Sequence, residues 1–402
     1  MMLRRALLLA IPGAFLVVGA VAALTFAPQA QPLEQAARGL PLPALIAGAL
    51  LAWRLRNARL FAVSAVVAAA YVVLHPSLLG ASGLPHAVII TFLPVGFALL
   101  ALQRDRGFTF SEVRRHLIMA IAPASIAAFF SAGRGDASLR LLTGIYIDPA
   151  YTDWSALPQL ALFTTAVSVL VVAYRALRRL NAGEAALFWV IIATAFALVA
   201  SPGSTTRGVW IVTSALIVIV ALVEIAYAFA FTDELTGLPG RRALNYMISS
   251  LRPPYAIAVV DVDHFKAFND THGHEVGDQV LRMVAARLSS VGGGGVAYRS
   301  GGEEFTIVFE GADKRQASEH AESVRAAVAN ATFALRRLPR PRDKRGKEKR
   351  GRTSGARDVL RVTISVGVAS ATNRSQTAHA VIEAADEAMY RAKTAGRNRV
   401  VA

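Results

Sequence analysis

The sequence predicts two fold classes in one chain, an all-α polytopic transmembrane domain over residues 1–231 and an α/β domain over residues 232–402. The first observation is composition, because 54% of the 402 residues are hydrophobic, more than in a typical soluble protein. The second is distribution, since the long apolar runs precede residue 232. The third is periodicity, because strand-like and helix-like patterns interleave after it. The sequence has no cysteine, which excludes a disulfide framework and a cysteine nucleophile.

Eight apolar segments are expected to form membrane-spanning helices, because most approach the roughly 20 residues that one span requires. Two of them, LPLPALIAGALLAW and LIMAIAPASIAAFF, are short. The first segment follows Arg4 and Arg5 and resembles a signal peptide, whose cleavage would leave seven spans. Its long apolar run favours an uncleaved helix instead. The segments are residues 7–26, 40–53, 60–79, 86–102, 117–131, 157–174, 185–200 and 209–231.

Arginines are unevenly distributed between the loops that join these segments. With eight spans, twelve arginines fall on one side and only Arg38, Arg134, Arg140 and Arg207 on the other. Positively charged loops mark the cytoplasmic side. We therefore expect a multi-pass protein of the bacterial cytoplasmic (inner) membrane, with its C-terminal domain in the cytoplasm. The twelve are Arg4, Arg5, Arg54, Arg56, Arg59, Arg104, Arg106, Arg114, Arg115, Arg175, Arg178 and Arg179.

The net charge of +16 does not indicate a nucleic-acid partner, because it is divided between membrane loops and one short segment. Residues 335–358 hold eleven basic and three acidic residues. The high charge and low apolar content of this segment predict a disordered insertion. It is either a solvated loop or a contact for anionic lipid headgroups.

Glu224 is the acidic residue of the last apolar segment. A carboxylate at membrane depth is a candidate functional group, although a position near the cytoplasmic end would let water or a partner helix solvate it. The segments lack a pair of Gly/Pro-broken helices in matching positions, which disfavours a transporter. We interpret residues 1–231 as a sensor whose signal the sequence does not identify.

Residues 232–402 are expected to fold as an α/β domain with a mixed, largely antiparallel central sheet flanked by helices. YAIAVVD is apolar and β-branched, as a buried strand is, and Gly301-Gly302 joins two strand-like runs into a hairpin. In chain order we expect a helix at 240–251, a strand at 255–261, a helix at 275–290, the hairpin, a helix near 314–332, a strand at 362–369 and a helix near 376–395.

Carboxylates mark one edge of this sheet. The strand at 255–261 ends in Asp261, and alternation places Asp261 and Asp263 on the same face. Glu303 follows the hairpin turn and could meet Asp261 at that edge. Paired carboxylates repel unless a cation lies between them, and oxygen ligands suit Mg²⁺ bound with a nucleoside triphosphate. The alternative is a pair of solvated strand-end carboxylates.

Cations and amides complete a candidate nucleotide site. Lys393 and Arg397 are four residues apart and can share a face. With Lys266 they would complement a triphosphate, although such a pair is more often a solvated face. Asn269 and Asp278 flank a Gly-rich turn and have the hydrogen-bonding groups that distinguish guanine from adenine. Each is alternatively an ordinary turn or N-cap residue.

Five stretches together resemble the GGDEF family of diguanylate cyclases in order and spacing. They are DELTGLPGRR (233–242), VDVDHFKAFNDTHGHEVGDQVL (260–281), RSGGEEF (299–305), SVGVA (365–369) and ADEAMYRAKTAGRN (385–398). The resemblance implies that two GTP molecules condense to cyclic di-GMP with release of pyrophosphate. It also implies a homodimer, since each domain holds one GTP.

The resemblance also implies roles for individual residues. Two Mg²⁺ ions per site, for which Mn²⁺ can substitute, would be held by Asp261, the Val262 carbonyl, Glu303 and Glu304. Glu303 and Glu304 would serve catalysis. The substrate-binding positions would be Phe265, Lys266, Asn269, His274, Asp278, Gly301, Gly302, Lys393 and Arg397, where the glycines let the nucleotide lie against backbone.

The sequence departs from the family pattern just before the hairpin. Many members carry Arg-x-x-Asp there, which binds the product and inhibits the enzyme, whereas this chain has Gly292, Gly293, Gly294 and Gly295. We expect no product inhibition at that site, and a flexible hairpin connection accounts for the glycines equally well. The alternative function is a catalytically inactive GGDEF-like nucleotide receptor, which the intact carboxylates and Gly-Gly turn disfavour.

Overall fold

The computed structural model describes residues 2–402 except 28–29, 75–82, 104–106, 132–134, 153–154, 156, 202, 332, 335–358 and 374–376. The chain divides into two compact units, Met1–Tyr227 and Ala228–Ala402. The basic segment 335–358 and three of the loop arginines, Arg104, Arg106 and Arg134, lie outside the described residues.

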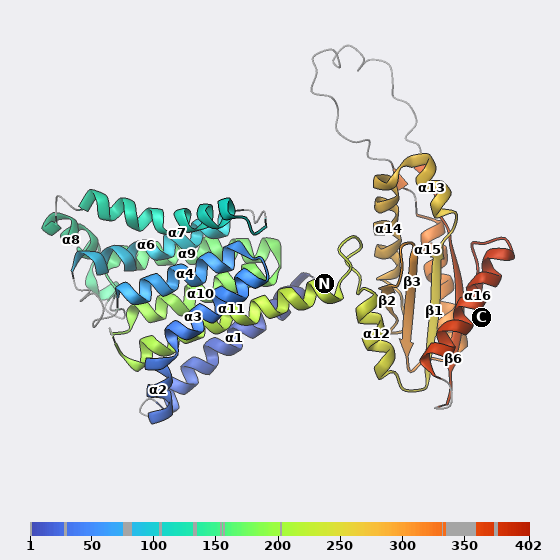
Figure 1. Ribbon diagram of the computed structural model, residues 1–402, viewed down its shortest axis with the longest axis horizontal. Coiled ribbons are helices and arrows are strands. Elements are labelled where there is room, and N and C mark those ends of the chain that lie inside the picture. The colour runs from blue at the N-terminus through green and yellow to red at the C-terminus, as the bar shows by residue number, and fades with distance from the viewer. Residues whose placement is uncertain are drawn as a thin grey trace, which may run out of the picture. The chain divides into compact units, whose positions relative to one another are not determined.

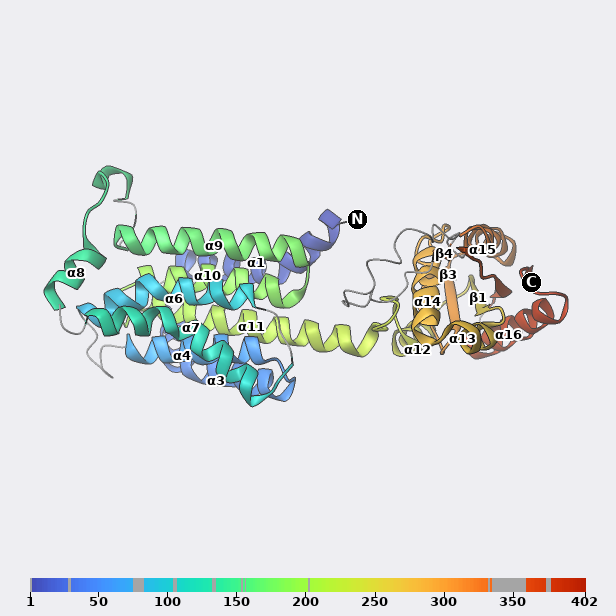
Figure 2. The ribbon, with the colours of Figure 1, turned by 90° about the horizontal axis from the view of Figure 1, so that it is seen from above.

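The first unit is helical (Figure 1). Each apolar segment that the sequence predicts overlaps one helix, and the helices run side by side in two perpendicular views (Figure 2). Residues 75–79 of the predicted segment 60–79 lie outside the described residues. The short α2 (Gln31–Gly39) and α8 (Gly135–Thr143) were not expected. The eight helices are α1 (Met2–Phe26), α3 (Pro41–Arg54), α4 (Ala58–Val73), α6 (Leu84–Leu102), α7 (Phe110–Ser131), α9 (Gln159–Arg179), α10 (Ala182–Val199) and α11 (Thr205–Phe231).

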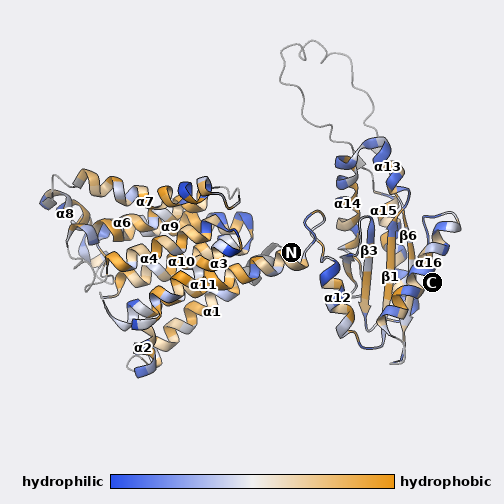
Figure 3. Ribbon diagram, in the orientation of Figure 1, coloured by the Kyte–Doolittle hydropathy of each residue, from blue (hydrophilic) through white to orange (hydrophobic). Residues whose placement is uncertain are grey.

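Within the described residues, five helices are long and apolar enough to cross a membrane. They are α6, α7, α9, α10 and α11, and the pair α2 and α3, bent by 53°, would count as a sixth. Hydrophobic residues follow much of the length of the five single helices, whereas α2 is largely hydrophilic (Figure 3). Helices pack closely at Gly96 of α6, where a Cβ atom would lie 2.2 Å from the Ala120 carbonyl oxygen.

The second unit is built on a five-stranded sheet in the order β2-β3-β1-β6-β7. All neighbouring pairs are antiparallel except β6 and β7, so the expected mixed, largely antiparallel sheet is confirmed. A two-stranded sheet pairs β4 (Phe333–Ala334) with β5 (Val359–Leu360). The main strands are β1 (Tyr255–Val262), β2 (Val296–Arg299), β3 (Glu304–Glu310), β6 (Ile364–Ala371) and β7 (Val400–Val401).

Helices cover both faces of this sheet (Figure 1). Alternate residues of β1, such as Ala258 and Val260, pack on α14 (His274–Leu288) and α15 (Lys314–Ala329). The other set, such as Ile257 and Val259, faces α16 (Ala378–Thr394). Because both faces are covered, β1 is buried throughout. The sequence pattern does not predict α13 (Phe265–His272), which follows β1 and precedes α14 in the chain. The helix α12 (Arg241–Ser250) is as expected.

One glycine sets the position of α16 over the sheet. A Cβ atom on Gly367 of β6 would lie 2.0 Å from the Ala385 carbonyl oxygen and 2.1 Å from the Met389 nitrogen. The backbone of α16 therefore rests directly on β6. This contact sets the distance between α16 and the sheet, and the last turn of α16 carries Lys393.

Candidate active site

The end of β1 and the end of α16 meet in an ion pair. Asp261 belongs to the strand set that faces α16, and its side chain is buried. Lys393 Nζ lies 2.9 Å from Asp261 Oδ2. Sequence reasoning placed Asp261 in a metal site and Lys393 in a phosphate site, and the structure brings the two residues together.

The hairpin turn lies beside this pair. The register of β1 with β3 sets Glu304 opposite Asp261, and the Val262 amide donates a hydrogen bond of 3.3 Å to the Glu303 carbonyl. The Glu303 side chain and the Val262 backbone then line one cleft of about 350 Å³ with the pair. Lining the cleft are Asp261, Val262, Asp263, His264, Phe265, Lys266, Ala267, Asp270, Glu303, Lys393 and Arg397.

The electrostatics of this cleft favour a cation between its carboxylates. Burial raises the pKa of Asp261 above its ordinary value, and the hydrogen bond and charge of Lys393 only partly oppose this rise. Burial also raises the pKa of Glu303, and the charge of Asp261 adds to that effect. Both carboxylates are harder to ionise than normal, and a cation bound between them would stabilise their ionised forms and lower both pKa values.

The donor set therefore fits Mg²⁺ in its usual protein environment. Among the described residues, no three His, Asp or Glu side chains form a preformed metal cage. Mg²⁺ seldom needs one, because it takes one or two carboxylates and completes its shell with water and substrate phosphates. Asp261, Glu303 and the Val262 carbonyl offer that partial set.

Asp263 has an internal role that sequence reasoning missed. Its carboxylate accepts hydrogen bonds from Thr363 Oγ1 at 2.6 Å, Ser365 Oγ at 2.7 Å and the Asn398 amide at 3.1 Å. It thereby ties the end of β1 to β6 and to the turn after α16. Arg397 lies in that turn with a left-handed backbone, φ of 63°, and it lines the cleft.

The predicted guanine-binding residues Asn269, His274 and Asp278 belong to α13 and α14 and are not among the residues that line the cleft. His274 is exposed and Asp278 is half-buried, and neither lines the cleft. Asn269 Oδ1 is buried with no hydrogen-bond partner among the described residues. A Cβ atom on Gly277 would lie 1.8 Å from this oxygen, so a glycine is required where Asn269 packs on α14.

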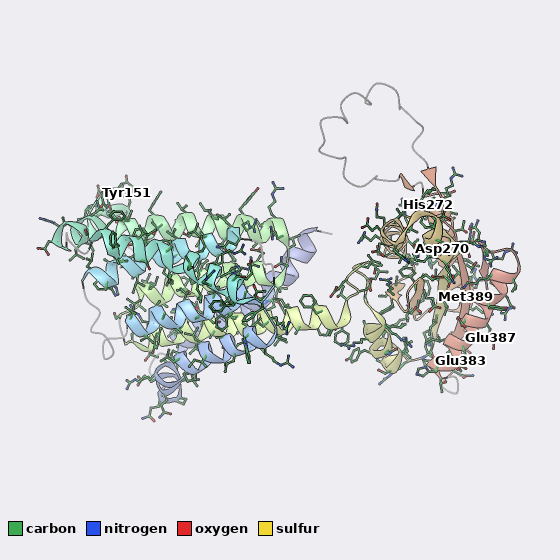
Figure 4. The ribbon with its side chains drawn as sticks, turned by 45° about the horizontal axis from the view of Figure 1, so that its top comes forward. Tyr151, Asp270, His272, Glu383, Glu387 and Met389 are labelled. Atoms are coloured by element: carbon green, nitrogen blue, oxygen red, sulfur yellow. The ribbon has the colours of Figure 1, made fainter. Side chains whose placement is uncertain are left out.

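The residues of α13 that line the cleft differ in how exposed they are to solvent. Phe265 is buried in the core and forms only the floor of the cleft, whereas Lys266 is exposed at its margin. Asp270 also lines the cleft, an acidic residue that sequence reasoning missed. Figure 4 labels Asp270 and His272 on α13, and Glu383, Glu387 and Met389 on α16.

The two hairpin glycines have different surroundings. A Cβ atom on Gly301 would lie 2.6 Å from Glu304 Oε2, so the Glu304 side chain folds over this glycine. A Cβ atom on Gly302 would meet nothing within 4 Å. The expected space for a ligand against the backbone is therefore present at Gly302, whereas Gly301 accommodates an internal contact.

Arg299 supports this turn from behind. Its Nη1 lies 2.9 Å and 3.0 Å from the two carboxylate oxygens of Asp233, and its Nη2 donates a 2.7 Å hydrogen bond to the Gly302 carbonyl. Burial alone would raise the pKa of Asp233, but hydrogen bonds from Thr236 and Arg299 outweigh it and lower that pKa. Both residues stand in quoted motifs, yet sequence reasoning gave neither a role.

The comparisons with known proteins identify this unit. Residues 230–343 and 344–399 match the family model described as "Diguanylate cyclase, GGDEF domain". The C-terminal unit of the chain belongs to the GGDEF domain family, and this family model does not cover the N-terminal helical unit.

Relatives with this domain include diguanylate cyclases. The chain is 36% identical over 180 residues to the response regulator PleD of Caulobacter vibrioides, covering 43% of this chain and 36% of that protein. It is 36% identical over 176 residues to the diguanylate cyclase VdcA of Vibrio cholerae, covering 43% and 47% respectively. The chain thus spans between a third and a half of these relatives.

A solved structure with sequence similarity is the GGDEF domain of DgcB from Caulobacter crescentus in complex with c-di-GMP. It is 32% identical, covers 43% of this chain and 92% of that chain, and superimposes with a TM-score of 0.36.

Proposed function

We propose that this chain is a membrane-anchored diguanylate cyclase that condenses two GTP molecules into cyclic di-GMP and two pyrophosphates. The observation that carries the proposal is the cleft in which Asp261 and Glu303 adjoin Lys393, Lys266 and Arg397. Carboxylates for a metal and cations for a triphosphate converge there. The family match and the diguanylate cyclase relatives support the same reaction.

The chain's own residues would act by positioning and by electrostatics. Lys266, Lys393 and Arg397 would contact the triphosphate of GTP. Bound Mg²⁺, held by Asp261, Glu303 and the Val262 carbonyl with Glu304 nearby, would neutralise charge that develops on the phosphate oxygens. Gly302 would let the nucleotide approach the turn.

Base selection would use α13 and α14. The Asp278 carboxylate can accept two hydrogens from the Watson–Crick edge of guanine, and Asn269 can pair with a further edge group. A buried amide oxygen without a partner is unfavourable. The unpartnered state of Asn269 therefore supports its role as a ligand-binding residue. His274 would lie beside them.

The reaction requires two domains face to face, each with one GTP. The 3′-oxygen of each ribose forms a bond to the α-phosphorus of the other nucleotide. The bond from that phosphorus to the bridging oxygen breaks, and pyrophosphate leaves. The hydroxyl proton passes to a base, for which we propose Glu304, whose carboxylate folds over Gly301 of the turn. Two such steps close the ring, so a homodimer is part of the proposal.

The helical unit would anchor this enzyme in a bacterial cytoplasmic membrane. Its five to six candidate spans and the arginine-rich loops support that placement, with the catalytic unit in the cytoplasm. Reporter fusions at the loop after α10 and at the C-terminus test the topology. We further propose that the basic segment 335–358 contacts anionic lipid, and charge reversal there should weaken binding to anionic liposomes.

The test of function is turnover by the purified full chain in detergent with Mg²⁺ and GTP. Mass spectrometry should detect cyclic di-GMP from the wild type and not from Glu303→Ala. Binding of GTP without turnover, under conditions where the chain is dimeric, would favour the alternative of an inactive nucleotide receptor.

A further inference from the structure

The helical unit buries one carboxylate among three guanidinium groups. Glu184 lies in the first turn of α10 and is fully buried. Its Oε1 accepts a hydrogen bond of 3.0 Å from Arg59 at the start of α4. The same oxygen lies 3.8 Å from Arg175 and 4.0 Å from Arg179, both near the end of α9. Three cations thus surround one anion.

This cluster has excess positive charge where solvation is poor. Arg59 is 6% exposed, and its Nε has no hydrogen-bond partner among the described residues. The Nε of Arg175 is also unpartnered, as is Oε2 of Glu184. Among the described residues, Glu184 is the one carboxylate paired with these arginines. Because Glu184 already pairs with Arg59, the other two, Arg175 and Arg179, have no close carboxylate of their own among the described residues. Removing one partner from a buried ion pair is destabilising, so the surplus cations favour a second anion.

Two helix ends add to the positive potential. The side chain of Asn57 caps α4 by accepting from the Leu60 amide at 3.0 Å. The side chain of Asn181 caps α10 by accepting from the Glu184 amide at 2.9 Å. Both helices therefore begin beside the cluster, and a helix N-terminus carries partial positive charge.

We propose that Arg59, Arg175 and Arg179 form a binding site for a phosphate-class anion. The planar guanidinium fork suits phosphate oxygens, and the unpartnered Nε atoms supply donors. The anion is either the headgroup of an anionic phospholipid or a free phosphate. It enters on the side of Arg179, whose side chain is 36% exposed against 8% for Arg59.

The site adjoins the helix that leads to the catalytic unit. A Cβ atom on Gly183 would lie 3.3 Å from Arg59 Nη2 and 3.9 Å from Ile225 Cδ1 of α11. Only Gly183 would therefore lie between an anion bound to Arg59 and the Ile225 side chain of α11. This inference concerns the helical unit and does not depend on the proposed cyclase activity.

Thermal stability of the full chain provides the test, with a matched control on the same helix. Arg178 is adjacent and equally charged, but its Nε donates to Tyr174 Oη at 3.0 Å and its side chain is exposed. We expect the wild type and Arg178→Gln to be stabilised by anion. The double variant Arg175→Gln/Arg179→Gln should lose at least tenfold in apparent affinity. Equal responses from all three proteins would overturn the proposal.

The probes distinguish the source of the phosphate. One arm adds inorganic phosphate to the chain in neutral detergent, and the other compares nanodiscs of phosphatidylglycerol with nanodiscs of phosphatidylcholine. Stabilisation only by phosphatidylglycerol identifies a lipid headgroup, and stabilisation by inorganic phosphate identifies a free anion. No stabilisation of the wild type in either arm refutes the site.

A second variant covers the case in which the double variant does not fold. Glu184→Gln removes the competing carboxylate and leaves all three arginines. If the cluster binds anions, the variant should be less stable without anion and should bind the stabilising probe more tightly than the wild type. Destabilisation that no probe reverses would mean that the cluster is a structural ion network.

Discussion

Arg299 joins Asp233 to the Gly301-Gly302 turn. One guanidinium nitrogen contacts both carboxylate oxygens of Asp233, and the other donates to the Gly302 carbonyl. We predict that Asp233→Asn lowers the stability of the fragment 228–402 by about 1–3 kcal/mol, the usual range for a lost hydrogen bond to a charged group. Turnover should fall on the order of tenfold or more, because Gly302 loses its support.

The pH dependence of this contribution has a defined sign. The pKa of Asp233 is lowered on folding, so its contribution is present above the unfolded pKa and is lost as pH falls through the folded pKa. Chemical denaturation of wild type and Asp233→Asn should differ at pH 7 and converge in strong acid. A difference that persists unchanged down to pH 2 would contradict this reasoning.

Lys393 is predicted to contribute both to the metal-free fold and to substrate binding. It pairs with Asp261 at 2.9 Å, and GTP with Mg²⁺ would offer it phosphate oxygens in place of that carboxylate. Lys393→Met should raise the KM for GTP at least tenfold and leave free Mg²⁺ affinity unchanged or higher, since a competing cation is gone. Isothermal titration with Mn²⁺ measures the second effect. The control is Arg391→Met, an exposed cation two residues earlier.

Glu303 should show opposed effects on stability and function. Its folded pKa is raised, so its stabilising contribution is present below the unfolded pKa and is lost as pH rises through the folded pKa. Glu303→Gln should therefore make the fragment more stable than wild type in EDTA at pH 8, with the gain vanishing near pH 4, while turnover is abolished. Glu383→Gln, an exposed change on α16, should alter neither. A less stable Glu303→Gln at pH 8 would contradict the prediction.

The four glycines before the hairpin should leave the enzyme without product inhibition at that position. A Cβ atom on Gly293 would lie 2.2 Å from His320 Cδ2, and one on Gly295 would lie 2.6 Å from Phe309 Cε1. Cyclic di-GMP titrated against initial rate should show no potent non-competitive inhibition. Gly292→Arg/Gly295→Asp should not restore it and should destabilise the domain by about 1–3 kcal/mol.

Signal transfer through α11 is predicted to depend on helical phase. Asp233 follows the helix by two residues, and the Gly240 amide donates to the Phe231 carbonyl at 2.8 Å. Insertions are therefore best placed before that contact, after Ala226. One added residue rotates the helix by about 100°, and four restore roughly one turn. Cellular cyclic di-GMP should fall with one or two alanines and recover with four. A flat response would exclude rigid coupling.

Features of the fold and of the candidate site that depend on a local sequence pattern could be predicted from the sequence. Asp261 is recognisable because a charged residue is unusual at the end of a buried apolar strand. The eight apolar segments are recognisable because a long run of apolar residues predicts a helix of similar length. The internal role of Asp263 was missed because alternation indicates the face on which a residue lies but not the residues that it contacts. Its partners, Thr363, Ser365 and Asn398, lie 100, 102 and 135 residues further along the chain.

Long-range pairing also explains the other omissions. The link from Asp233 to Arg299 joins residues 66 apart, and no local spacing reveals it. The α13 helix has only 8 residues and begins after a left-handed His264, so it carries too few apolar positions for a periodic pattern. The cluster around Glu184 was not predicted, because the positive-inside rule counts arginines in the loops and does not consider which side chains they contact.

The contact between Asp233 and Arg299 has a practical consequence for how this chain is divided. The sheet begins only at Tyr255 and the first helix of the fold at Arg241, so a parsing based on regular elements would cut near residue 240. Such a cut removes the carboxylate that anchors the turn. A fusion of this C-terminal unit to another membrane domain should therefore include Asp233, or the new partner should supply an acidic residue at the same position.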